Sequence, residues 1–168
     1  MDEERASARG ERVLVVDDEA NMVHFLTKLL AHEGYEVTGV PSATEALQRL
    51  KDLPWDLVLC DLKLPGGDGM EVLKAVRETL PEAVVVMMTA YGTIPSAIEA
   101  MREGAYDYVT KPFRAHEILA VVDKALERSR LRREVQHLRK VVEQRFGSGG
   151  LVGKSKAMQE VYTQIEKV

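Results

Sequence analysis

The sequence predicts an α/β fold in which a five-stranded parallel sheet is covered by helices on both faces. Short apolar runs alternate with amphipathic stretches along the chain, which is the order expected of repeated strand–helix units. The apolar runs are continuous, as in VVVMM at 84–88, and continuous runs are typical of strands buried on both faces. The chain has 168 residues, of which 45% are hydrophobic, so it can form one core of ordinary size and an appendage.

Short sequence patterns predict the position of each strand and helix. The predicted strands are RVLVVD (12–17), YEVTGV (35–40), DLVLCD (56–61), AVVVMMTA (83–90) and YDYVT (106–110). The first predicted helix follows residue 18, has an apolar face, and stops at Gly34. Ser42 and Glu45 form a capping box that opens the second helix. Further helices are predicted over 70–80, over 94–104 with Gly104 as its end, and from near Arg114 onward.

Charge and cysteine content exclude several classes of protein. The 23 Lys and Arg residues against 27 Asp and Glu residues give a net charge of −4, which argues against nucleic-acid binding by the whole chain. The single cysteine, Cys60, excludes an internal disulfide and fits a reducing cytoplasm.

We expect residues 1–10 to be disordered, because MDEERASARGER has no apolar core and is no signal peptide. No run is apolar enough to suggest a membrane partner.

Polar residues stand at the carboxyl ends of the predicted strands, where parallel sheets bind ligands. These residues are Asp17 and Asp18, Asp61, Thr89, Tyr108 and Lys111. Three carboxylates that lie close together repel each other and usually hold a cation, and all-oxygen ligands suggest Mg²⁺. A carboxylate nucleophile, a metal, an ammonium group and a hydroxyl together form a site for a phosphoryl group.

Each of these residues has a simpler explanation when it is taken alone. Asp18 could be a helix N-cap, Thr89 could bond to the backbone, and Tyr108 could be a packing aromatic. Suitable residues from several elements at one edge of the sheet favour a functional site over these explanations.

Four motifs resemble the response-regulator receiver domains of two-component signalling. They are VLVVDDE (13–19), DLVLCDLKLPGGDG (56–69), VVMMTAYG (85–92) and GAYDYVTKPF (104–113). The resemblance covers about residues 11–125. It implies a flavodoxin-like (CheY-like) doubly wound sheet with strand order 2-1-3-4-5, and a phosphoacceptor signalling domain rather than an enzyme with turnover.

The same resemblance assigns expected functions to single residues. It implies that Asp61 accepts a phosphoryl group from a histidine kinase and that Lys111 and Thr89 contact the phosphoryl oxygens. Asp18 would bind Mg²⁺ directly, Asp17 through water, and Lys63 through its backbone carbonyl. Thr89 and Tyr108 would form the conformational switch. A cis peptide bond is expected before Pro112.

The end of the chain contains an apparent phosphate-binding loop. FGSGGLVGKSKAM (146–158) has Ser148 where such a loop needs its first glycine. LVGKSKAMQEVYTQIEKV (151–168) instead resembles the opening of the AAA+ ATPase domain of NtrC-type activators, in which the true loop comes later. The resemblance implies that 147–168 is a linker and the start of a truncated ATPase domain. Sigma-54 RNA polymerase and DNA would then be partners of the full-length protein.

A long helix is predicted between these two regions, because no Gly or Pro occurs from Arg114 to residue 146. Leu131, Val135, Leu138 and Val142 are spaced as in the seam of a coiled coil. We therefore expect 126–146 to be a coiled-coil linker in a homodimer that phosphorylation repacks. The alternatives are a single amphipathic helix on another domain, and a monomer that dimerises only after phosphorylation.

Two other functions of the acidic site remain as rivals. A haloacid-dehalogenase-like phosphatase needs an Asp two residues after its nucleophile, whereas Glu19 follows Asp17 and Lys63 follows Asp61 at that distance. A flavin-binding module needs a neutral, hydroxyl-rich loop after the first strand, whereas DDEANM is acidic. A purely structural dimerisation module would not explain the acidic cluster.

Overall fold

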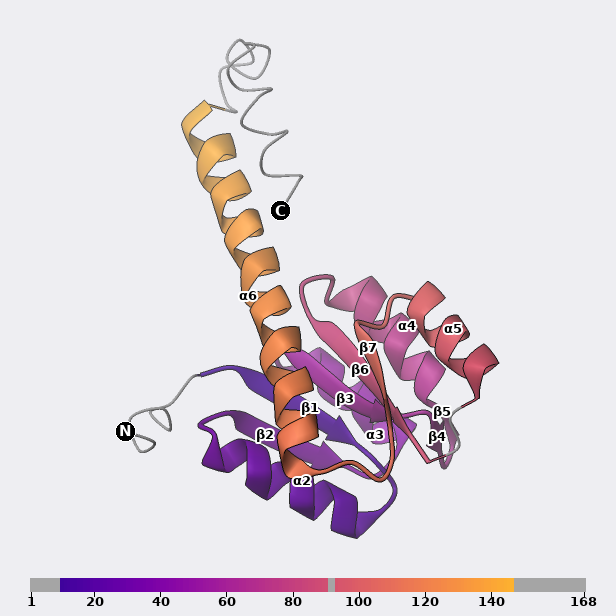
Figure 1. The fold of residues 1–168 in the computed structure, drawn as a ribbon. Coiled ribbons are helices and arrows are strands. Elements are labelled where there is room, and N and C mark those ends of the chain that lie inside the picture. The colour runs from indigo at the N-terminus through magenta and orange to yellow at the C-terminus, as the bar shows by residue number, and fades with distance from the viewer. Residues whose placement is uncertain (1–9, 91–92, 147–168) are drawn as a thin grey trace. The chain divides into compact units, whose positions relative to one another are not determined.

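The computed structural model describes residues 10–90 and 93–146. Five parallel strands form one sheet in the order β2-β1-β3-β6-β7 (Figure 1). Their bounds are β1 Arg12–Val16, β2 Glu36–Val40, β3 Leu57–Asp61, β6 Val84–Thr89 and β7 Asp107–Thr110. The predicted fold class and the strand order 2-1-3-4-5 are therefore confirmed. The N-terminus expected to be disordered, up to residue 9, and the ATPase-like segment from residue 147 lie outside the described residues.

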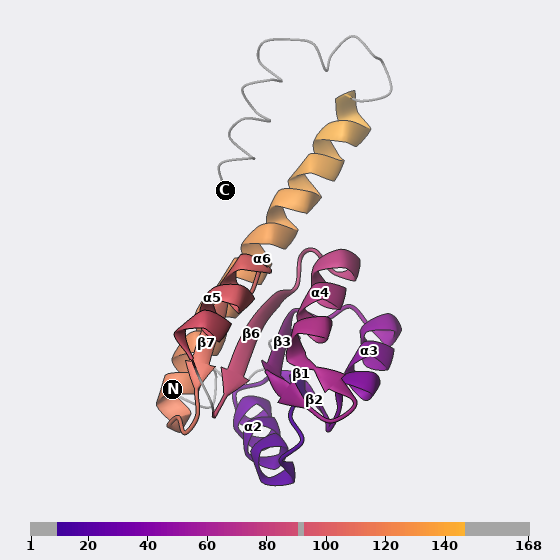
Figure 2. The ribbon, with the colours of Figure 1, turned by 90° about the vertical axis from the view of Figure 1, so that its right-hand side faces the viewer.

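Helices cover both faces of this sheet (Figure 2). They are α2 Ala20–His32, α3 Ala43–Asp52, α4 Gly69–Thr79, α5 Ile94–Arg102 and α6 Ala115–Phe146. One core cluster joins the sheet to α2 and to the first turns of α6, with Leu26, Leu30 and Ile118 fully buried. The other cluster joins the opposite face of the sheet to α3, α4 and α5. The sheet is thus buried on both faces, as the continuous apolar strands predicted.

Side-chain caps begin three of the helices. Ser42 Oγ accepts a hydrogen bond from the Glu45 N–H at 3.2 Å, at the predicted start of α3. Asp68 caps α4 by accepting from the N–H groups of the two residues that follow Gly69. Helix α5 begins with a reciprocal capping box between Thr93 and Ser96, which was not predicted from the sequence.

A short hairpin follows β3 and leads into α4. Strand β4 (Lys63–Leu64) pairs with β5 (Gly67–Asp68) in antiparallel register. The helix then packs directly on the end of β3, because a Cβ atom on Gly69 would lie only 2.2 Å from the Asp61 carbonyl oxygen. Only glycine permits this close approach.

Helix α6 runs unbroken from Ala115 to Phe146, so the long helix predicted from near Arg114 is confirmed. Its first turns belong to a compact unit that ends at Leu126, and the rest belongs to a second unit. In that second unit Leu131 and Leu138 are 41% and 45% exposed, and Val135 and Val142 are partly exposed. Within residues 10–90 and 93–146, every helix is too short or too polar to cross a bilayer.

Candidate functional site

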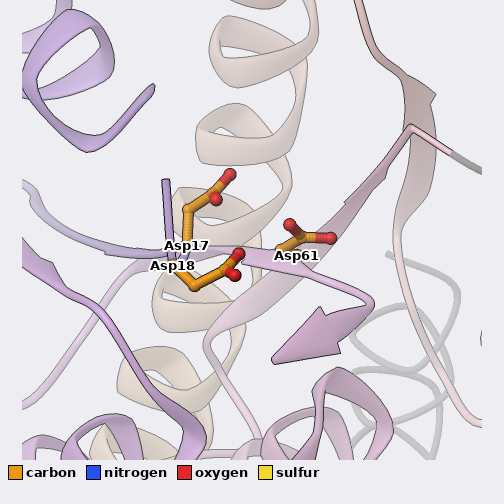
Figure 3. Close-up of side chains that lie close together, drawn as sticks. All are labelled: Asp17, Asp18 and Asp61. Carbon is orange, nitrogen blue, oxygen red and sulfur yellow. The ribbon is translucent and has the colours of Figure 1, made fainter. Parts of the chain in front are cut away.

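Three carboxylates meet at the carboxyl edge of the sheet (Figure 3). Asp17 and Asp18 directly follow β1, and Asp61 ends β3. One oxygen from each lies within 4.8 Å of the others. Asp17 and Asp61 are buried, whereas Asp18 is exposed. The structure therefore brings together the acidic cluster that the strand ends predicted.

The parallel pairing of β1 with β3 places these side chains level with each other. Val16 is the partner of Cys60 in the register, so the next residue on each strand is an aspartate. The Asp17 N–H donates to the Val40 carbonyl at 3.1 Å, and the Asp17 Oδ1 atom accepts from the Glu19 N–H at 2.9 Å. Asp17 is therefore fixed through both its backbone and its side chain.

Lys111 joins the two buried carboxylates. Its Nζ atom lies 2.5 Å from Asp17 Oδ2 and 3.0 Å from Asp61 Oδ2. Its backbone N–H donates to the Thr89 carbonyl at 2.8 Å, and the Lys111–Pro112 peptide bond is cis, as expected. The cluster contains three carboxylates and one ammonium group, so its formal charge is −2 and suits a divalent cation.

Burial and pairing shift the pKa values in this site. Burial raises the pKa of the Asp61 carboxyl, although the hydrogen bond from Lys111 acts in the opposite direction. Burial alone would lower the pKa of Lys111, but its hydrogen bonds with Asp17 and Asp61 outweigh burial and raise it. Lys111 is therefore a cation at neutral pH. Burial, followed by the charge of Asp61, raises the pKa of Cys60 well above its usual range, so Cys60 remains a thiol.

The donor set fits a hard cation. Each oxygen of Asp17 accepts a hydrogen bond, from Glu19 or from Lys111. Asp18, by contrast, makes no hydrogen bond or ion pair within the described part of the chain, so its carboxylate is open to a ligand. All three candidate ligands are carboxylates, which suits Mg²⁺ rather than a metal that prefers sulfur or nitrogen.

Lys63 lies two residues after Asp61 and contacts it through the backbone. The Lys63 N–H donates to Asp61 Oδ1 at 3.3 Å. The two oxygens of Asp61 thus have different partners, the Lys63 N–H and the Lys111 ammonium. The metal-binding function of the Lys63 carbonyl remains a prediction.

The two predicted switch residues lie on the neighbouring strands. Thr89 is buried at the end of β6, and Tyr108 is half-buried on β7. The Tyr108 hydroxyl lies 3.2 Å from Ser96 Oγ on α5. Their functions as switch residues remain predictions.

Two residues that contact site residues had no function predicted from the sequence. The Glu19 carboxylate lies 3.9 Å from Lys111 Nζ. Because Glu19 directly follows Asp17 and Asp18 in the sequence, its place beside the acidic cluster could have been predicted. Ser96 was missed because no sequence pattern pairs position 96 with position 108.

Comparisons with known proteins define the class of this domain. The family model described as "Response regulator receiver domain" matches residues 13–123, which is more than half of the chain. The chain therefore belongs to the response-regulator receiver family, as its four motifs predicted.

Two curated proteins illustrate the relationship. The chain is 34% identical over 157 residues to the regulatory protein AtoC of Escherichia coli K12, covering 94% of this chain and 34% of AtoC. It is 33% identical to the nitrogen assimilation regulatory protein NtrX of Azorhizobium caulinodans, with 93% of this chain and 34% of NtrX covered. The chain thus spans about a third of the length of these relatives.

Solved structures give the same result. NtrX from Brucella abortus in complex with ADP superposes with a TM-score of 0.72 at 38% identity, over 94% of this chain and 34% of NtrX. The beryllofluoride-activated NtrC4 receiver domain dimer gives a TM-score of 0.67 at 33% identity, over 70% of this chain and 98% of that receiver.

Proposed function

We propose that Asp61 accepts a phosphoryl group from a histidine kinase, or from a small acyl phosphate, in a Mg²⁺-dependent reaction. The observation that carries this proposal is the shared ion pair of Lys111 with Asp17 and Asp61, next to the open carboxylate of Asp18. A carboxylate oxygen of Asp61 forms the new bond to phosphorus. The bond from phosphorus to the donor nitrogen or acyl oxygen breaks, and its electron pair leaves with the donor.

The residues of the chain prepare Asp61 for this step. Lys111 and the Lys63 N–H hold the two oxygens of Asp61, which orients the carboxylate. The Lys111 ammonium also attracts the phosphoryl oxygens, and the hydroxyl of Thr89 donates to them in the product. Bound Mg²⁺ would supply positive charge that offsets the repulsion between the anions. Asp18 would hold it directly, Asp17 through water, and Asp61 and the Lys63 carbonyl would complete the protein ligands.

Phosphorylation then changes the face formed by α5, β7 and α6. The Thr89 hydroxyl moves toward the phosphoryl group, and the Tyr108 ring enters the space that Thr89 vacates. The position of Thr89 at the end of β6, next to the strand that bears Tyr108, supports this coupling. It is a packing change that new charge drives, which is a common form of switch.

The output of this switch is control of transcription by an NtrC-type, sigma-54-dependent activator in the cytoplasm. The similarity to AtoC covers 94% of the chain, so it extends beyond the receiver match, which ends at residue 123. NtrX of Brucella abortus was solved with ADP and with ATP, which supports a nucleotide-binding domain after the region that it shares with this chain. Contacts with sigma-54 RNA polymerase and with DNA would belong to the rest of the protein.

We also infer a homodimer that is present before phosphorylation. The exposed Leu131 and Leu138 on α6 supply an apolar seam. The solved NtrC4 receiver is a dimer in its beryllofluoride-activated form, so it supports pairing of receivers but not the state in which pairing occurs. In this arrangement the unphosphorylated dimer inhibits the ATPase domains, and phosphorylation repacks it. A monomer that dimerises only when phosphorylated is the competing arrangement.

Mass spectrometry after treatment with acetyl phosphate and Mg²⁺ tests the phosphoacceptor. The wild-type chain should gain one phosphoryl group, and Asp61→Asn should gain none. Equal labelling of the two proteins contradicts the assignment of Asp61. Steady release of phosphate from simple phosphomonoesters would support the phosphatase alternative.

A further inference from the structure

A pair of hydroxyl groups joins β7 to α5 on the face opposite α6. The Tyr108 hydroxyl oxygen lies 3.2 Å from Ser96 Oγ. Tyr108 packs against the core between the sheet and helices α3 to α5, and Ser96 is the third residue of α5. Both residues are half-buried, so water competes with this contact less than it would at an exposed site.

The hydroxyl of Ser96 has more potential partners than it can satisfy at once. It donates to the Thr93 carbonyl at 2.9 Å, and it lies 3.3 Å from the Thr93 N–H and 3.0 Å from Thr93 Oγ1. A serine hydroxyl offers one proton and two lone pairs. Either hydroxyl could donate across the Ser96–Tyr108 pair. When the Ser96 proton goes to the Thr93 carbonyl, Tyr108 is the donor. The Tyr108 hydroxyl then competes with the two Thr93 donors for the two lone pairs.

This competition makes the Ser96–Tyr108 bond easy to break. When Tyr108 leaves, Ser96 still has the Thr93 N–H and hydroxyl as partners, so no polar group on α5 is left unsatisfied. Breaking the bond therefore avoids, at Ser96, the cost of an unpaired hydroxyl. A weak contact of this kind can favour one position of the Tyr108 side chain over another and still allow the side chain to move between them.

We propose that Ser96 holds Tyr108 in its resting position. It thereby sets the equilibrium between the resting and activated conformations of the receiver before phosphorylation. This inference rests on the proposed switch and adds a positioning residue to it. Lys111 is bonded to the carboxylates of both Asp17 and Asp61, and in this proposal the Tyr108 position that accompanies that pairing is the resting one. Entry of the Tyr108 ring toward Thr89 requires the bond to Ser96 to break.

Removal of this bond should favour the activated state. A neutral intramolecular hydrogen bond contributes about 1 kcal/mol net, which is a factor of about five in the balance of two states. If the resting state predominates, the apparent affinity for a phosphoryl mimic rises by the same factor. We therefore expect Ser96→Ala to bind beryllofluoride about fivefold more tightly than the wild type, in Mg²⁺ and with the full chain.

Tyr108→Phe removes the same bond from its other end and keeps both the ring and the capping box of α5. It should strengthen beryllofluoride binding by a similar factor, and the double variant should add no further gain. Ser96→Thr keeps a hydroxyl group and should restore wild-type affinity. Thr93→Ala weakens the cap and removes one competitor of Tyr108 for Ser96. It should therefore lower the melting temperature without any gain in affinity, in contrast to Ser96→Ala.

A second measurement needs neither metal nor phosphoryl mimic. In metal-free protein with labelled tyrosines, Ser96→Ala should shift the Tyr108 ring resonances toward their positions in the beryllofluoride-bound wild type. Unchanged resonances, or additive effects of Ser96→Ala and Tyr108→Phe on affinity, overturn the proposal and leave Ser96 only as a cap. Failure of the wild type to bind beryllofluoride at all would contradict the proposed function instead.

Discussion

Lys111 Nζ lies closer to Asp17 Oδ2, at 2.5 Å, than to the oxygen of the proposed phosphoacceptor. The side chains of Lys111 and Asp17 are almost fully buried. Asp17 therefore keeps a charged partner for Lys111 whatever happens at Asp61. In the proposed reaction, this pairing would keep the ammonium group buried and protonated while Asp61 is phosphorylated.

Loss of Lys111 should destabilise the metal-free domain. Lys111→Met leaves two buried carboxylates facing each other without a cation, and breaking a buried ion pair costs about 3 kcal/mol or more. Urea unfolding in EDTA should show a loss of about this size in the free energy of unfolding. The exposed Lys74 offers the control, because Lys74→Met should change stability little. Equal stability of the two variants would show that the ion pair does not hold the strand ends together.

Mg²⁺ should raise the melting temperature through Asp18. A ligand that binds only the folded state stabilises it by about 2.7 kcal/mol at one hundred times its dissociation constant. Asp18→Asn removes the open carboxylate and should abolish most of the rise seen by calorimetry during a Mg²⁺ titration. Asp52→Asn, an exposed site at the end of α3, should respond as the wild type does. A full response in Asp18→Asn would place the metal elsewhere.

The raised pKa of Asp61 predicts a pH-dependent gain in stability for Asp61→Asn. Below the pKa of the unfolded state, Asp61 is protonated in both states and contributes nothing. As pH rises toward neutrality, the unfolded state ionises first, because burial raises the pKa in the folded state. The carboxylate therefore costs stability at neutral pH. In EDTA, the stability of Asp61→Asn relative to the wild type should increase between pH 4 and pH 7. A difference that is constant with pH would contradict the shift.

The pattern of apolar strands was enough to predict the sheet and the meeting of Asp17, Asp18, Asp61 and Lys111. Parallel strands have their carboxyl ends at the same edge of the sheet. A residue that directly follows a predicted strand can therefore be placed at that edge from the sequence alone. The bond between Ser96 and Tyr108 could not be predicted in this way. This bond depends on the rotamers of the two side chains and on the position of α5 along the axis of β7.

The start of α5 at Ile94 agrees with the prediction, but its capping box and the hairpin of β4 and β5 were not predicted, for different reasons. In the sequence TIPS (93–96), the third residue after the N-cap is Ser96. The usual capping box has glutamate or glutamine there, as in the pair Ser42 and Glu45. The two-residue strands of the hairpin are too short for any alternation of polar and apolar residues to appear.

Gly69 should be essential for the geometry of Asp61. An added Cβ would lie 2.2 Å from the Asp61 carbonyl oxygen, which belongs to the backbone and cannot rotate away. Gly69→Ala should therefore push α4 from the end of β3 and lower the free energy of unfolding by about 2 kcal/mol, as overpacking does. It should also slow labelling of Asp61 by acetyl phosphate. Wild-type stability and labelling in Gly69→Ala would mean that α4 can shift without disturbing the site.

The seam on α6 should hold the unphosphorylated chain together as a dimer. Leu131 and Leu138 are exposed apolar side chains one heptad apart, and aspartate at both positions would place charges in the seam. Sedimentation at micromolar concentration should show a dimer for the wild type and a monomer for Leu131→Asp with Leu138→Asp. His137→Asp with Gln144→Asp adds the same charges outside the seam, also one heptad apart, and should remain a dimer. A monomeric wild type before phosphorylation would favour dimerisation by phosphorylation instead, and an intact dimer in the leucine variant would place the interface on another surface.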